Sequence, residues 1–132
     1  MIDVVGWFET GAGGARFHPV APVRTLDTRI APGACRWRAA RTSAPRWPGP
    51  RRAWTRAVAV VGNLTVTEAA GPAFITAWPS GEAQPWASVQ NTVAGTTRAN
   101  QAMVKVGTNG QVDVANSAGA VHVIIDVVGY FS

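Results

Sequence analysis

The chain has 132 residues, a formal net charge of +5, and 47% hydrophobic but only 14% charged residues. This length fits a single domain, and the small charged share excludes a disordered acidic or basic tail. The longest apolar run, Val121–Val128, is far too short to cross a bilayer, so we expect no membrane span. The 14 Gly and 9 Pro argue against a protein built of long helices.

The predicted elements are strands separated by turns. Gly71-Pro72 breaks the chain, Pro79–Gly81 forms a turn, Asn109-Gly110 is a type I′ hairpin signal, and 116–119 is a second turn. The strands are expected at 57–67, 73–78, 89–93, 102–106, 111–115 and 121–131. This spacing, without a helical period, predicts an all-β fold, an antiparallel β-sandwich.

A seven-residue segment occurs twice. Ile2–Phe8 reads IDVVGWF and Ile125–Phe131 reads IDVVGYF, 123 residues further on. Either two strands share similar local needs, or a unit of this length occurs in tandem. On the second interpretation, 1–8 is the last strand of a preceding unit, 9–16 a Gly-rich linker and 17–132 one complete unit. Each copy would place Ile, Val and Trp or Tyr on one face and Asp, Val and Phe on the other.

Several motifs together resemble a known family. They are Arg24–Arg29 (RTLDTR) after Phe17–Val20, Asn63–Thr67 (NLTVT), and Asn116–Gly119 leading into the closing strand. In combination they resemble a tandem β-rich repeat domain of secreted and surface proteins from high-GC actinobacteria. The resemblance covers 2–33 and 57–131. It implies export and an all-β module without catalysis of its own.

Location and partners follow from that resemblance as expectations. Met1–Asp3 has no basic region followed by an apolar one, so we expect no signal peptide in this chain. The chain would then belong to a longer exported protein, extracellular or at the cell surface. Its partners would be other copies of the repeat or attached domains.

Residues 34–56 depart from the family. They hold seven of the twelve basic residues and three Trp, and subtracting these seven charges from +5 leaves −2 for the rest. Such a stretch could be a basic-aromatic arm for nucleic acid or membrane surfaces. An out-of-frame passage explains it better, because a one-base shift of GC-rich codons restores typical family residues. We therefore expect no specific nucleic-acid partner and an exposed excursion that forms no strand pair.

Two tryptophans suggest a ligand site. Trp78 and Trp86 flank a Pro-rich loop, and aromatic side chains near a loop can stack on sugar rings, with Gln84, Ser88 or Asn91 offering hydrogen bonds. The alternative is that one or both tryptophans cap the end of the core. The competing functions are therefore a structural or spacer repeat and a carbohydrate- or cell-wall-binding module that binds polysaccharide.

Asp27 and Arg29 are predicted to fix a turn at a strand end. The Asp would accept backbone amides, and the Arg would reach a carboxylate such as Asp126 or Asp3.

No residue pattern indicates an enzyme, a metal site or a cofactor. His18 is expected in a loop and His122 in the closing strand, and the single Cys35 can form no internal disulfide.

Overall fold

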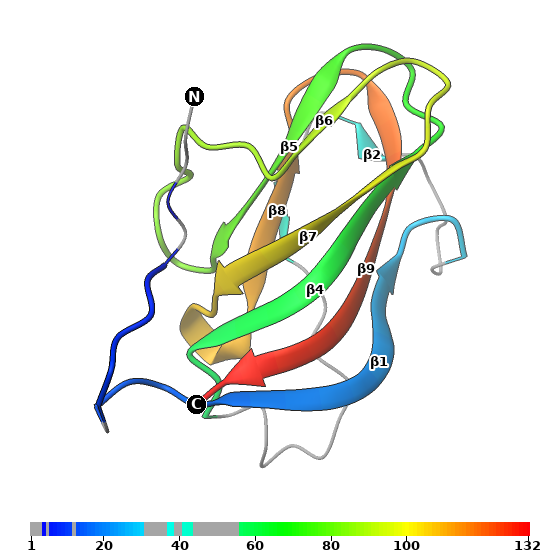
Figure 1. Cartoon of the computed structure of the whole chain (residues 1–132). Helices are drawn as coiled ribbons and strands as arrows, with labels where there is room; N and C mark the ends of the chain where they lie inside the picture. Colours follow the sequence, from blue (N-terminus) through cyan, green and yellow to red (C-terminus); the bar gives the residue numbers. More distant parts are fainter. Residues whose placement is uncertain (1–3, 5, 12, 31–36, 39–40, 44–55) are drawn as a thin grey trace.

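The computed structural model describes residues 4, 6–11, 13–30, 37–38, 41–43 and 56–132 (Figure 1). In chain order the elements are β1 (Phe17–Asp27), β2 (Trp37–Arg38), β3 (Arg41–Ser43), β4 (Ala59–Thr67), β5 (Ala73–Pro79), β6 (Gln90–Thr92), β7 (Arg98–Lys105), the 3-10 turn η1 (Thr108–Gly110), β8 (Val112–Asn116) and β9 (Ala120–Phe131).

The strands form two sheets in which every pair is antiparallel. The first has the order β1-β9-β4-β7, with β2 also against β9, and the second has the order β3-β8-β5-β6. The two sheets pack face to face. The predicted all-β antiparallel sandwich is confirmed.

The predicted strands after residue 56 are all present. Their ends agree within two residues, except that β7 begins at Arg98, four residues before the predicted start. β1 was not among the predicted strands, and His18 lies in it rather than in a loop. Pro19 and Pro22 obscure its pattern. Proline is tolerated there because β1 is an edge strand whose register shifts between Pro19 and Val23.

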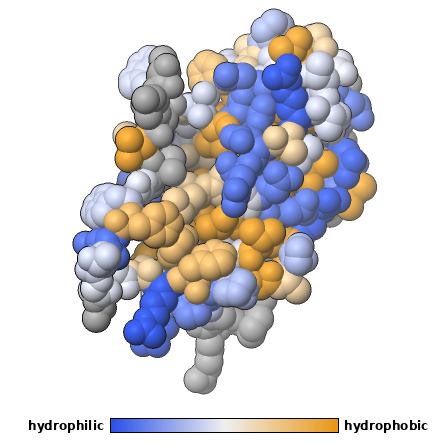
Figure 2. Space-filling model, in the orientation of Figure 1, coloured by the Kyte–Doolittle hydropathy of each residue, from blue (hydrophilic) through white to orange (hydrophobic). Residues whose placement is uncertain are grey.

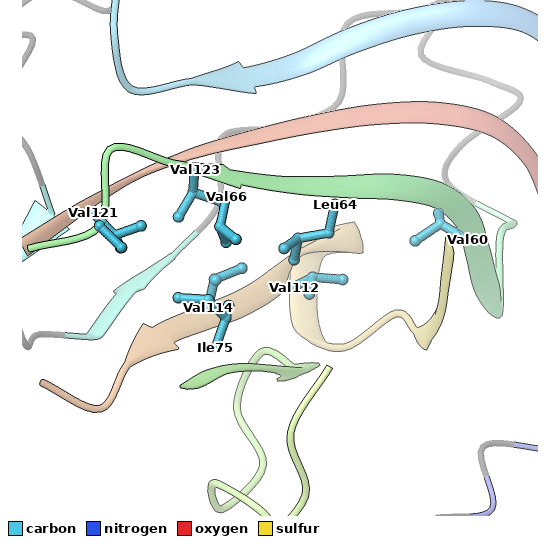
Figure 3. Packing of buried hydrophobic residues seen from close by; sticks show 9 residues of the cluster. Val60, Leu64, Val66, Ile75, Val112, Val114, Val121 and Val123 are labelled. Carbon is cyan, nitrogen blue, oxygen red and sulfur yellow. The ribbon is translucent and has the colours of Figure 1, made fainter. Parts of the chain in front are cut away.

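The core lies between the sheets and consists mainly of aliphatic side chains. Alternate residues of β4 and β9 point inward and meet inward-pointing residues of β5 and β8 (Figure 3). The buried cluster comprises Val60, Leu64, Val66, Ala69, Ile75, Val112, Val114, Val121 and Val123. Branched side chains suit this position because they pack well on a pleated, buried surface.

A register shift in the pairing of β9 determines which of its side chains face the core. The β4–β9 register slips between Val61 and Gly62, opposite Gly129 and Val127. Strict alternation would place the Tyr130 side chain on the other face of the sheet from Val127, so the expected grouping of Ile, Val and Tyr on one face requires this shift. The shift turns Tyr130 toward the core.

Asn109-Gly110 does not form the predicted hairpin. β7 pairs with β4 in the first sheet and β8 pairs with β5 in the second, so η1 crosses between the sheets. The crossing is bound to the turn after β5, because Thr108 N–H donates to the carbonyl of Ser80 at 2.8 Å. Gly110 has a φ of 71°, which explains the glycine without a type I′ turn.

The segment 34–56 contributes two short strands, contrary to expectation. Trp37–Arg38 pairs with β9 opposite Val121 and Ala120, and Arg41–Ser43 pairs with β8. Backbone pairing is thus compatible with the Arg-rich composition of this stretch. The expectation that its other residues form an exposed excursion lies outside the described residues.

The residue just before β1 pairs with the residue just after β9. Arg16 N–H donates to the carbonyl of Ser132 at 2.9 Å, and Ser132 N–H donates to that of Arg16 at 3.0 Å. Among the described residues before β1, none is in a strand. The expected division into a preceding strand, a linker and one unit stays a prediction.

Candidate functional site

A groove lies against the outer face of the second sheet, close to its edge strand β6. Its volume is about 410 Å³, and it is lined by Phe74, Gln84, Pro85, Trp86, Ala87, Ser88 and Asn91, which together we call the Trp86 groove. Of the five candidate residues named from the sequence, four line this groove: Gln84, Trp86, Ser88 and Asn91. Phe74 is the aromatic member of the lining that sequence reasoning missed.

Strand register explains how distant residues meet in the groove. Phe74 in β5 lies directly opposite Asn91 in β6, so their side chains share one face of the sheet. Ile75, the next residue, is completely buried in the core. Phe74 therefore points away from the core, and 43% of its surface is exposed. The signal available in the sequence was its alternation with Ile75.

The loop between β5 and β6 carries Trp86 and is fastened at both ends. At its start, Glu82 N–H donates to the carbonyl of Pro79, and the Glu82 carboxylate pairs with Lys105 Nζ at 2.8 Å. At its end, Val89 N–H donates to the carbonyl of Ile75 at 2.8 Å. These anchors present Trp86, which is fully exposed, beside the groove.

Trp78 does not belong to the groove. It is 1% exposed, and its indole Nε1–H donates to the carbonyl of Glu82 at 3.1 Å. A sugar ring needs an accessible aromatic face, so Trp78 cannot serve as a stacking platform. Its role is structural, because it holds the loop that carries Trp86 against the sheet.

The chemistry of the groove is neutral. Its lining combines two aromatic faces with two amide side chains and one hydroxyl, and none of the described residues that line it is ionisable. Amide groups both donate and accept hydrogen bonds. Such a surface suits an uncharged ligand with flat apolar faces and hydroxyl groups.

Asp27 and Arg29 form the predicted turn. The Asp27 carboxylate accepts the backbone N–H of Arg29 at 3.1 Å and its guanidinium Nε and Nη2 at 2.9 and 2.7 Å. The side-chain hydrogen bond from Arg29 lowers the pKa of the Asp27 carboxyl from 3.8 to about 2. Burial opposes this shift, while the Arg29 backbone N–H and the charges of Arg29 and Arg24 reinforce it.

Of the two partners expected for Arg29, Asp126 was wrong. Arg29 reaches Asp27 itself, whereas Asp126 binds Arg24, whose Nε and Nη2 lie 2.8 and 3.0 Å from its two oxygens. Arg24 also contacts Asp27 at 3.3 Å. Arg24 and Asp126 are directly opposite in the β1–β9 register, which the sequence alone could not show. Asp3 lies outside the described residues.

Thr28 lies next to these ion pairs and adds hydrogen bonds to β9. Its N–H donates to the carbonyl of Val123, and its hydroxyl accepts the Val123 N–H at 2.9 Å. The Thr28 side chain thereby continues the pairing of β9 beyond the end of β1. Every residue of the LDTR motif therefore has a structural place, since Leu26 packs against the core.

Both histidines contact hydroxyl groups of residues far away in the sequence. His122 Nδ1 lies 3.1 Å from the Thr28 hydroxyl, and His18 stacks on Tyr130 with Nε2 3.0 Å from the Ser132 hydroxyl. Within the described ranges, no three His, Cys, Asp or Glu side chains are grouped so that they could hold a metal ion. Nor does that part of the chain contain a helix long and apolar enough to span a membrane.

A second, smaller void of about 30 Å³ lies between the sheets and is lined mostly by apolar residues of β4, β5, β7, β8 and β9. Its position inside the core makes it a packing gap, too small for an organic ligand.

The described part of the chain is an all-β sandwich that carries an exposed aromatic groove on its surface. Comparison with known proteins finds no family model and no curated protein that matches the chain.

Proposed function

We propose that the chain is a non-catalytic structural or interaction module, one unit of a tandem array within a longer secreted or cell-surface protein. The observation that carries this proposal is the backbone pairing of Arg16 with Ser132. Because the opening and closing strands meet there, one unit can follow another without disturbing either sandwich. The repeated IDVVG-aromatic-Phe segment supplies the sequence support, and the family resemblance supports export.

The repeat also sets the spacing of units. Phe8 corresponds to Phe131 of a preceding unit, so only residues 9–16 separate one closing strand from the next opening strand. Nine residue steps reach at most about 30 Å. Neighbouring units would thus be held close together, with other copies or attached domains as their partners.

A two-unit chain tests this function. Phe131 of the first copy is followed directly by Glu9 of the second, and unfolding is measured by calorimetry and circular dichroism. We expect both units to fold, with the unfolding enthalpy of the single chain doubled. A control joins the copies through a long Gly/Ser linker. If the linked control folds but the direct junction leaves a unit unfolded, the repeat interpretation is wrong.

A second candidate function, binding of a neutral polysaccharide, is favoured by the Trp86 groove. The fully exposed indole of Trp86 lies near Phe74 and two amide side chains, and the lining residues that the structure describes carry no charge. Aromatic faces would stack on sugar rings, and Gln84 and Asn91 would bond to their hydroxyl groups.

The binding candidate has a matched control within the chain. Trp7 is 83% exposed and lies outside the groove, so W7A removes an exposed tryptophan without touching the lining. We expect a glycan array and pull-down on insoluble polysaccharides to show binding that W86A abolishes and W7A keeps. Equal behaviour of the two variants would contradict binding at this groove.

A further inference from the structure

Three aromatic rings gather where the 17–132 unit begins and ends. The rings of Phe17 and Phe131 are 5.3 Å apart and inclined at 54°, and those of Phe8 and Phe131 are 6.4 Å apart at 56°. We call Phe8, Phe17 and Phe131 the aromatic pole. Tilted ring pairs at these distances attract beyond the burial of their area.

The pole lies on an apolar part of the first sheet's outer face. Phe17 pairs with Phe131 across β1 and β9, and a Cβ at Gly129 would collide with the Phe17 ring. The glycine of the repeated segment thus makes room for this ring. Figure 2 shows hydrophobic surface gathered over the lower part of this face, near the C-terminus, and hydrophilic surface above it.

Residues 6–8 lie close to this face. A Cβ at Gly6 would lie 3.6 Å from Met103 Cε in β7, while the Phe8 ring contacts Phe131 in β9. Residues 6–8 therefore run across the sheet from β7 toward β9. Phe8 still exposes 85% of its surface and Phe17 47%, so the pole retains apolar area for a neighbour.

We infer that consecutive units pack through the aromatic pole, the last Phe of one unit resting on Phe131 of the next, which itself packs against Phe17. This inference rests on the proposed tandem array. Phe8 occupies the repeat position of Phe131, so the Phe8–Phe131 contact joins the corresponding residues of two successive units. The occupant of the apolar face is thus the closing strand of the preceding copy.

The contact is tested first in the full chain by nuclear Overhauser spectroscopy with selectively labelled Phe and Met. We expect cross-peaks between the Phe8 and Phe131 rings, and F8A to shift the Phe131, Phe17 and Met103 signals. W7A, which removes the neighbouring exposed ring, should leave them in place. Absence of the cross-peaks, or equal effects of F8A and W7A, would overturn the inference.

The two-unit chain then tests packing between units by ¹⁵N relaxation. Packed units should tumble with the correlation time of their combined mass, and F131A in the first unit should shorten it toward that of one unit. The same substitution in the single chain measures any loss confined to one unit. Two folded units that tumble independently overturn the packing but leave the array intact. An unfolded second unit overturns the array itself, and the packing with it.

Discussion

The Asp27 carboxylate accepts hydrogen bonds from both the backbone N–H and the guanidinium of Arg29, two residues further along the chain. One side chain thus fixes the turn after β1 and neutralises a charge there. Asp27 is only 7% exposed, so the loss of its partner would leave a poorly solvated carboxylate.

Acid should weaken the Asp27–Arg29 interaction within a defined pH window. The pKa of Asp27 is about 2 in the folded protein against 3.8 ordinarily, so its ionised form favours folding. The contribution is complete above about pH 4 and is lost as the pH falls toward 2. We expect D27N to lower the free energy of unfolding at pH 7 by about 1–2 kcal/mol.

Urea unfolding at pH 7, 4, 3 and 2 measures this effect. The difference between the wild type and D27N should shrink across the lower values. E82Q is the control, because the exposed Glu82–Lys105 pair should contribute at most about 1 kcal/mol. A difference that does not change with pH would refute the role of the Asp27 charge.

The Thr28 hydroxyl should matter more than its methyl group. T28V removes the acceptor for the Val123 N–H in a site that is only 5% exposed, and should cost about 1–3 kcal/mol of unfolding free energy. T28S keeps the hydroxyl and should cost less. Chemical denaturation compares the two variants, and equal losses would show that the hydrogen bond contributes little.

Replacing Trp78 and replacing Trp86 should have different effects on the stability of the protein. W78A empties a buried site and loses the bond to Glu82, so we expect a loss of about 3–5 kcal/mol. W86A removes a fully exposed side chain and should change stability by less than about 0.5 kcal/mol. Thermal unfolding measures both variants. A large loss for W86A would mean that its indole packs against the domain.

Gly62 should tolerate no side chain. A Cβ there would lie 2.6 Å from the backbone oxygen of Asp126, which cannot move aside as a flexible side chain could. We expect G62A to cost roughly 1–3 kcal/mol. G71A is the matched control, since a Cβ at Gly71 meets nothing within 4 Å. If both variants unfold at the same denaturant concentration, the close approach at Gly62 is not a constraint.

Local signals predicted the strands after residue 56 well, because alternation and turn residues act within a few positions. The Asp27 turn was predictable for the same reason, since Asp27 and Arg29 are only two residues apart. The sheet to which each strand belongs was not predictable locally. Asn109-Gly110 looks like a hairpin turn, yet Val104 and Val112 on either side face each other across the core.

The groove illustrates the same limit. Trp78 and Trp86 looked equivalent in the sequence because both flank one loop. Their burial differs because Trp78 lies in a strand and is covered, while Trp86 lies in the loop. Phe74 and Asn91 meet only through the β5–β6 register, which depends on pairing rather than on composition.

The adjacency of Arg16 and Ser132 has a mechanical consequence. β1 and β9 are antiparallel neighbours whose outer ends lie together, so a pull on both ends loads their hydrogen bonds one after another. Such a pair opens like a zipper, beginning at Arg16 and ending at the Thr28–Val123 contact. In the proposed array, units under tension would therefore lengthen one domain at a time at low force, as an extensible tether does and a stiff rod does not.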